Sequence, residues 1–243
     1  MIYDVYEYTN EGGRSYNEDS VTHDIYGNSG LFAVADGLGG HQYGEVASEC
    51  VCYMLLEEWQ RAGGETSAQW LEDTIELANQ KVLELQKEKK ADLKSTVVAL
   101  AINNGRAVWA NVGDSRLYYI HNSRIEAVTN DHSVAFKRYK AGEISRDDIR
   151  TDADQSGLLR AVGNVERHQP EVYDYDVIVQ PGDAFMLCTD GMWEYLSDEE
   201  VLFELLKSRD AKEWSERLLL RLMNRIKGNN DNLTILTVMA FSD

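Results

Sequence analysis

The chain has 243 residues, of which 43% are hydrophobic, so it can bury a sizeable core. Its formal net charge of -18 argues against a nucleic-acid partner, which needs a basic surface, and against docking on an anionic membrane. Only two prolines occur and no linker-like stretch divides the sequence, so residues 1–243 are expected to form a single domain.

Three cysteines, Cys50, Cys52 and Cys188, are an odd number without the spacing of a metal site. They lie in apolar segments, which predicts buried free thiols and a reducing compartment. The N-terminus lacks the basic start and apolar core of a signal peptide, and no apolar run approaches the length of a transmembrane helix. We therefore expect a cytoplasmic location.

The first third of the chain predicts two strands followed by two amphipathic helices. Residues 2–8 form the first predicted strand, and the continuous apolar run "LFAVAD" (31–36) predicts a buried second one. Apolar residues at helical spacing predict a helix over 43–61, and a second apolar stripe runs through 71–85. The sequence "TSAQ" (66–69) matches a capping box and predicts where the second helix begins.

The middle of the chain predicts a series of strands joined by tight turns. The connecting sequences "NNG", "GDS" and "HNS" are typical of hairpins, and strands joined in this way must pair antiparallel. The predicted strands cover residues 95–102, 106–113, 115–120 and 125–129.

The last part of the chain contains a polar segment and then returns to regular elements. Residues 131–169 are charged and weakly periodic, which predicts a helix followed by irregular structure. Further strands are predicted at 172–179, 183–189 and 233–241, with a helix capped by Ser197 and Glu200 and a longer helix over 210–226. Strands grouped between pairs of helices predict an α+β fold in which antiparallel sheets carry helices on their outer faces.

The stretch "VADGLGGHQYGE" (34–45) places an aspartate and several glycines between a predicted strand and a predicted helix. A dinucleotide loop would need a different glycine spacing and a following parallel strand, and a Walker-type phosphate loop would need Gly-Lys-Ser/Thr. The sequence has none of these features, so a nucleotide loop is disfavoured. A second stretch, "MLCTDGMWEYLS" (186–197), has the same order of apolar run, Asp-Gly pair and helix.

Acidic residues collect at strand ends and at the turns beside them. Asp36 and Asp190 each end an apolar strand and are each followed by glycine, while Asp114 lies in a hairpin. A carboxylate at the mouth of a buried strand is costly unless it is paired, hydrated or bound to a cation, and no lysine accompanies these positions. Ordinary turn aspartates are the alternative, but their number favours a site for divalent cations, which prefer oxygen ligands. The complete set is Glu18, Asp19, Asp36, Asp114, Asp190 and Asp231.

An ordered series of motifs covers almost the whole chain: "RSYNEDS" (14–20), "ADGLGGHQYGEVAS" (35–48), "NVGDSRLY" (111–118), "TNDHS" (129–133), "GLLRAVG" (157–163), "CTDGMWEYLS" (188–197) and "DNLTILTV" (231–238). In these motifs and their order the chain resembles the metal-dependent protein serine/threonine phosphatases of type 2C, the PPM family, in their compact bacterial form. The resemblance implies an α/β/β/α sandwich of two antiparallel sheets flanked by helix pairs, with a mobile flap over residues 131–169.

The resemblance also implies a centre of two Mn²⁺ or Mg²⁺ ions. In such enzymes a metal-bridging water or hydroxide directly attacks phosphoserine or phosphothreonine in proteins. Carried over to this sequence, Asp36 bridges both ions and the Gly37 carbonyl completes the coordination of one. Asp190 and Asp231 hold the other ion.

Further acids are assigned by the same resemblance. Glu18 holds metal-bound waters, with support from Asp19. Asp114 matches an acid that binds a third, weaker ion together with Asp190 in bacterial relatives. The alternative for Asp114 is a structural turn aspartate paired with Arg116.

The phosphate-binding residue and the proton donor complete the expected site. Arg14 matches the family's phosphate-binding arginine, whose planar guanidinium can grip phosphate with two hydrogen bonds. Animal relatives carry a histidine directly after the Asp-Gly pair as the proposed general acid, but this chain has Leu38 there. His41 is the candidate donor in its place, with metal-bound water or a structural role for His41 as alternatives.

The resemblance implies phosphorylated protein substrates of a cognate serine/threonine kinase, and a monomeric enzyme. Two other functions stay open at this point. One is a non-catalytic module that senses phosphopeptides or metal, which is disfavoured because Asp36, Asp190 and Asp231 are all present. The other is a two-metal phosphoesterase that acts on small molecules.

Overall fold

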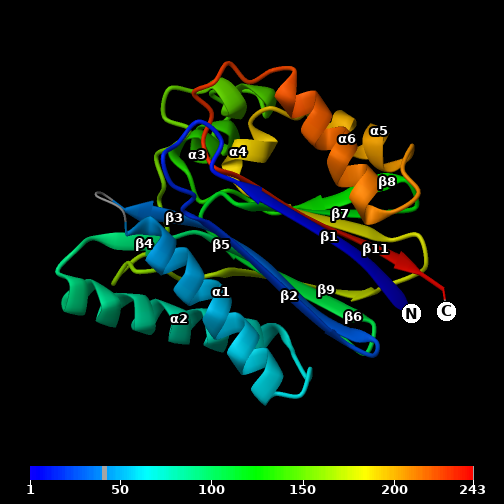
Figure 1. The fold of residues 1–243 in the computed structure, drawn as a ribbon, viewed down its shortest axis with the longest axis horizontal. Helices are drawn as coiled ribbons and strands as arrows, with labels where there is room; N and C mark the ends of the chain where they lie inside the picture. The colour runs from blue at the N-terminus through cyan, green and yellow to red at the C-terminus, as the bar shows by residue number, and fades with distance from the viewer. Residues whose placement is uncertain (40–42, 243) are drawn as a thin grey trace.

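The computed structural model describes residues 1–39 and 43–242, so that His41 lies outside the described part of the chain. Two antiparallel sheets pack face to face (Figure 1). The first sheet contains, in spatial order, β1 (Ile2–Asn10), β11 (Leu233–Phe241), β10 (Ala184–Cys188), β7 (Arg116–His121) and β8 (Arg124–Val128). The second contains β2 (Asp19–Tyr26), β3 (Ser29–Gly39), β5 (Val97–Asn103), β6 (Arg106–Val112) and β9 (Glu171–Ile178), and β4 (Leu93–Ser95) pairs with β3.

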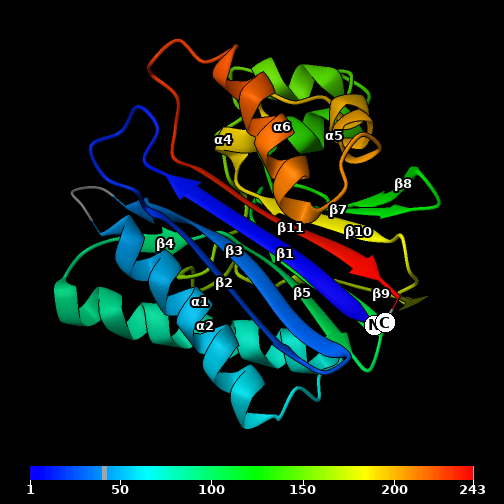
Figure 2. The same ribbon diagram turned by 45° about the vertical axis from the view of Figure 1, so that its right-hand side comes forward.

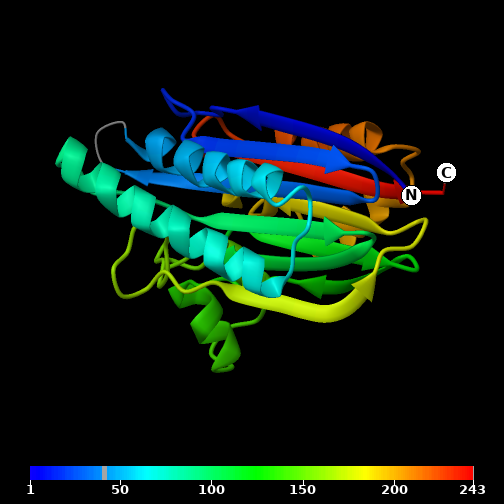
Figure 3. The same ribbon diagram turned by 90° about the horizontal axis from the view of Figure 1, so that it is seen from below.

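Helices cover the outer faces of both sheets (Figures 1 and 2). Two long helices, α1 (Gly44–Arg61) and α2 (Ala68–Lys89), lie across the second sheet, as the view from below shows (Figure 3). The first sheet is covered by α5 (Asp198–Leu205) and α6 (Ala211–Met223). Three short helices complete the chain, α3 (Val134–Lys140), the 3-10 helix η1 (Asp147–Thr151) and α4 (Asp190–Trp193). The predicted α+β class and the α/β/β/α layers are therefore confirmed.

Most predicted elements are present, with small differences at their ends. No range was predicted for β2 or β4, which the structure adds. The capping box of α5 is confirmed, since the Ser197 side chain accepts from the Glu200 backbone and the Glu200 side chain accepts in return. At the start of α2 the prediction is one residue early, because Ser67 rather than Thr66 caps the helix. The Thr66 carbonyl instead accepts a hydrogen bond from Asn103 at 2.9 Å.

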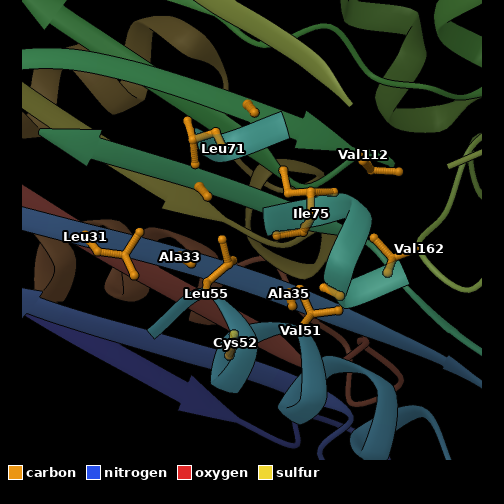
Figure 4. Close-up of a cluster of buried hydrophobic side chains, with 14 of the residues drawn as sticks. Leu31, Ala33, Ala35, Val51, Cys52, Leu55, Leu71, Ile75, Val112 and Val162 are labelled. Atoms are coloured by element: carbon orange, nitrogen blue, oxygen red, sulfur yellow. The ribbon is translucent and has the colours of Figure 1, made fainter. Parts of the chain in front are cut away.

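The continuous apolar run of β3 is explained by the burial of this strand on both faces. Side chains alternate along a strand, so Leu31, Ala33 and Ala35 face the two long helices, where they meet residues such as Val51 and Ile75 (Figure 4). The intervening side chains of β3 point into the apolar layer between the two sheets. A third apolar cluster lies between the first sheet and its covering helices.

Strands β3 and β10 together place two aspartates at one end of the sandwich. Asp36 continues the inner face of β3, which is apolar up to that point. In β10, Phe185 and Leu187 lie between the sheets, and Asp190 follows the strand as the first residue of α4. Each aspartate is therefore held by a strand that is itself fixed by burial.

The three cysteines are free thiols, as predicted. Cys52 and Cys188 are buried, whereas Cys50 is only half-buried. Within the described residues, none of the helices combines the length and the apolar character that a bilayer crossing requires.

Candidate active site

A cavity of about 470 Å³ opens at the end of the sandwich where α4 begins. Most of the predicted site residues line it, although they come from five separate parts of the chain. Asp19 does not line the cavity but is buried beside it, opposite Asp36 in the pairing of β2 with β3. The predicted residues on the cavity wall are Arg14, Glu18, Asp36, Gly37, Asp114, Asp190 and Asp231.

Hydroxyl groups of neighbouring residues hold Asp36 and Asp19 in place. The backbone nitrogen of Asp36 donates to Thr96 Oγ1 at 2.9 Å, and Ser95 Oγ donates to the Asp36 carbonyl at 3.0 Å. Thr189 Oγ1 donates to Asp19 Oδ2 at 2.9 Å. Ser95, Thr96 and Thr189 are buried, so these hydrogen bonds fix the strand ends with little competition from water. The sequence analysis did not identify these hydroxyl residues.

The glycine after each strand-end aspartate is required by close packing of the backbone. A Cβ atom on Gly37 would lie 2.2 Å from the Gly44 carbonyl oxygen and 2.5 Å from the Glu18 carbonyl oxygen. A Cβ atom on Gly191 would lie 1.9 Å from the carbonyl oxygen of Asn232. Only glycine permits these approaches, which join α1 to β3 and α4 to the start of β11.

Asn232 joins the N-terminal loop to the start of β11. Its Nδ2 donates to the carbonyl oxygens of Glu11 at 2.9 Å and Tyr16 at 2.8 Å. Its Oδ1 accepts from the Glu18 backbone nitrogen at 2.9 Å. Asn232 therefore fixes the loop that carries Arg14 to the cavity wall. The motif "DNLTILTV" contains this residue, but its partners are too distant in sequence for the motif to reveal them.

The loop of Asp114 is supported by a buried ion pair. Arg116 donates to both oxygens of Asp131, at 2.8 and 2.7 Å, and its guanidinium lies 3.6 Å from the ring centroid of Trp193. The Trp193 Nε1 donates to the Asp114 carbonyl at 2.9 Å. The ion pair that Arg116 makes among the described residues is with Asp131, so the pairing considered for Asp114 is not observed there.

The predicted flap, residues 131–169, packs against α4 and the turn that follows it. Arg150 Nε donates to the carbonyl oxygens of Trp193 at 3.3 Å and Leu196 at 3.0 Å. Gln155 Nε2 donates to Glu194 Oε1 at 2.8 Å. These contacts place two further residues of the segment, Ser156 and Leu158, on the wall of the cavity.

The electrostatics of the cavity are dominated by negative charge. Burial raises the pKa of Asp190 to about 6, and the neighbouring Asp231 carboxylate adds to this shift. Burial, and then the surrounding carboxylates, raise the pKa values of Asp36 and Asp114 well above their usual range. Arg14 is the single cationic residue on the cavity wall among the described residues, and its Nη2 donates to Asp231 at 2.7 Å.

The oxygen atoms at the cavity are suitable ligands for divalent cations. Asp190 Oδ1 and Asp19 Oδ1 are buried and have no hydrogen-bond partner within the described residues, which leaves unsatisfied oxygens beside the cavity. Carboxylate and carbonyl oxygens are the ligands that Mg²⁺ and Mn²⁺ prefer. Among the described residues, no group of three or more His, Cys, Asp or Glu side chains is placed to hold a metal ion by itself. Ions of this kind retain several waters, so a closed protein cage is not required.

Comparisons with known proteins agree with this arrangement. The family model described as protein phosphatase 2C matches residues 9–223. The serine/threonine phosphatase stp of Listeria monocytogenes is 34% identical over 233 residues, which cover 93% of this chain and 90% of the relative. The structure of Stp1 from Staphylococcus aureus has a TM-score of 0.86 at 25% identity, with 100% of this chain and 96% of that chain covered. The catalytic domain of PstP, in complex with 2 manganese ions, has a TM-score of 0.83 at 25% identity, with 99% of both chains covered.

The double antiparallel sheet with its covering helices is thus the fold of solved serine/threonine phosphatases. The chain belongs to the protein phosphatase 2C family. The predicted enzyme class, a serine/threonine protein phosphatase, is confirmed by these matches.

Replacing Asn232 by alanine removes three hydrogen bonds that hold the N-terminal loop. We expect the free energy of unfolding to fall by about 1–3 kcal/mol, because buried partners lose their hydrogen bonds. Backbone amides of residues 13–18 should exchange hydrogen faster, as measured by mass spectrometry. Asn229→Ala, at an exposed asparagine, is the control and should change neither quantity. Unchanged exchange in Asn232→Ala would mean that other contacts hold the loop.

Proposed function

We propose that this chain hydrolyses phosphoserine and phosphothreonine in proteins phosphorylated by a cognate serine/threonine kinase. Residues 1–243 would act as one catalytic domain, with 131–169 as its flap. The observation that carries the proposal is the gathering of four aspartates from separate elements around one cavity, with Arg14 at its rim. Ser/Thr phosphatases among the relatives and a neighbour solved with 2 manganese ions support the same reading.

The aspartates would hold two Mn²⁺ or Mg²⁺ ions. We assign Asp36 to both ions, the Gly37 carbonyl to one of them, and Asp190 and Asp231 to the other. Such ions would activate water near neutral pH and would offset the negative charge of the phosphoryl oxygens. The raised pKa values of Asp36 and Asp190 support this assignment, because buried carboxylates that crowd one another are stabilised in their charged form by a bound cation.

The remaining residues would orient the reactants. Glu18 would accept hydrogen bonds from waters at the site and Asp19 would support Asp36 from the neighbouring strand. Asp114, on the far wall, would contribute to a third and weaker cation site with Asp190. The leaving hydroxyl requires a proton, for which we propose His41 or a water molecule as the donor.

Arg14 would bind the substrate phosphate. Its side chain is 58% exposed and pairs with Asp231, so it can be reached by a substrate that enters the cavity. A cation on Asp231 would weaken this ion pair and leave the guanidinium free for phosphate. The substrate phosphate would then replace the Asp231 carboxylate as the partner of Arg14, so that the guanidinium would keep a counter-charge.

The proposal is tested by hydrolysis of an aryl phosphate and of a phosphothreonine peptide, each with Mn²⁺ and with a chelator. We expect turnover of both with Mn²⁺ and loss of activity with the chelator. Asp36→Asn and Asp190→Asn should lower kcat/KM at least about 100-fold, because each removes a charged ligand. Asp92→Asn, at an acid that is 76% exposed, should retain full activity.

Each alternative has its own outcome in this experiment. Activity in the chelator, or full activity in Asp190→Asn, would contradict the two-metal site. Binding of the phosphopeptide without turnover would indicate a sensing module. Turnover of the aryl phosphate alone would indicate a small-molecule phosphoesterase.

The role of Arg14 predicts a distinct kinetic change. In Arg14→Ala we expect KM to rise about 10- to 100-fold, which corresponds to about 1.5–3 kcal/mol for hydrogen bonds to a charged group. The fall in kcat should be smaller, because the lost contact binds ground state and transition state alike. Arg209→Ala, at an arginine that is 86% exposed, is the control. An unchanged KM in Arg14→Ala would count against this assignment.

Metal binding should also change how stability depends on pH. Burial raises the pKa of Asp190 to about 6 and that of Asp19 to about 7, both above the usual 3.8. In the metal-free protein their contribution to stability is therefore fully present below about pH 4 and is lost as the pH rises through about 6 and 7. Mn²⁺ replaces the protons, so it should raise the melting temperature more at about pH 8 than at about pH 5.5. A rise that is equal at both pH values would contradict this reading.

A further inference from the structure

A second cavity, of about 630 Å³, is lined by residues of β8 and β9, which are the edge strands of the two sheets. We call it the tyrosine groove, after Tyr119, Tyr173 and Tyr175, which line it together with Glu126 and other residues. None of the described residues on its wall also lines the cavity of the aspartates. Its volume lies in the range of ligand-binding sites, and the proposed phosphatase chemistry does not use it.

An irregular stretch of β9 holds the most exposed ring of the groove. The pairing of β9 with β6 shifts register between Ala107 and Trp109, and Asp176 has a left-handed φ of 60°. Bulges of this kind redirect side chains. Tyr175 is 62% exposed, yet its ring lies 5.8 Å from that of Trp109 and 6.0 Å from that of Tyr173 between centroids. The backbone at Asp176 is strained, and the neighbouring Tyr175 ring is presented to solvent, where it gains little stabilisation from burial. This placement points to a binding role for Tyr175.

The hydroxyl groups of Tyr119 and Tyr173 are already hydrogen-bonded, so the ring faces form the main free surface of the groove. The Tyr119 hydroxyl donates to Asp183 at 3.2 Å, and the Tyr173 hydroxyl accepts from the Asn130 backbone at 2.9 Å. Glu126, by contrast, is exposed and makes no hydrogen bond or ion pair with any described residue. Aromatic faces beside one uncompensated carboxylate suit a planar organic cation, because both attract positive charge.

We propose that the tyrosine groove binds an arginine side chain on a short segment of a partner protein. The guanidinium would stack on the tyrosine rings and donate hydrogen bonds to Glu126. The net charge of -18 favours a basic partner, and Glu126 is the one acidic side chain among the described residues that line the groove. The cavity is larger than one guanidinium, so residues that flank the arginine also fit.

The test is calorimetric titration of the Mn²⁺-loaded protein with the peptide Ac-Gly-Thr-Arg-Thr-Gly-NH2. The comparison peptide replaces arginine by citrulline, which keeps the shape and removes the charge. We expect the arginine peptide to bind at least about fivefold more tightly than the citrulline peptide. Tyr175→Ala and Glu126→Gln should each weaken binding at least about fivefold, whereas Tyr175→Phe keeps the ring and should bind as the parent does.

Tyr26→Ala, at a tyrosine that is 75% exposed on β2, is the matched control and should leave binding unchanged. Equal binding of the two peptides would overturn the proposal, as would undiminished binding to Tyr175→Ala or no binding to the parent protein. The readout is binding and not hydrolysis, so its result does not depend on the proposed function. Phosphatase activity of Tyr175→Ala on the aryl phosphate should match that of the parent, which also shows that the variant is folded.

Discussion

Repulsion among buried carboxylates is the constraint on which the rest of the structure depends. Asp36, Asp114 and Asp190 lie at one end of the sandwich, where burial and then the neighbouring carboxylates raise the pKa of each. Once ionised, such a group repels itself, so a rigid scaffold is needed to hold it together. The three residues come from a strand, a hairpin turn and a helix start, so that no single element has to bear the whole repulsion.

The scaffold holds these charges together without neutralising them. Behind the cavity, Arg116 is fully engaged by Asp131, so the buried pair adds rigidity but little net charge to the site. Gly37 and Gly191 let backbones meet where a Cβ atom would collide, which makes the aspartate-bearing turns compact. A lysine or arginine placed deeper in the cavity would stabilise the empty protein, but it would compete with the cations that the carboxylates are suited to bind.

How far the sequence predicts this structure depends on how local each feature is. Strand β3 and the cap of α5 could be predicted, because alternation and capping involve residues close in sequence. The start of α2 was missed by one residue, since Thr66 and Ser67 are adjacent and both can cap a helix, and in the structure Ser67 does so. The contacts of Asn232 could not be predicted, because they join residues more than 200 positions apart.

The two cavities show how one acidic chain can distinguish two kinds of cation. The aspartate cavity offers a high density of negative oxygen, which a small divalent ion needs to compensate the loss of its hydration shell. The tyrosine groove offers ring faces and the single carboxylate of Glu126, which is too little charge to dehydrate such an ion. A guanidinium is weakly hydrated and stacks on aromatic rings, so the walls of the groove suit it. If both proposals hold, the separation of metal and peptide would follow from the chemistry of the two walls, although net charge would attract both cations to the same molecule.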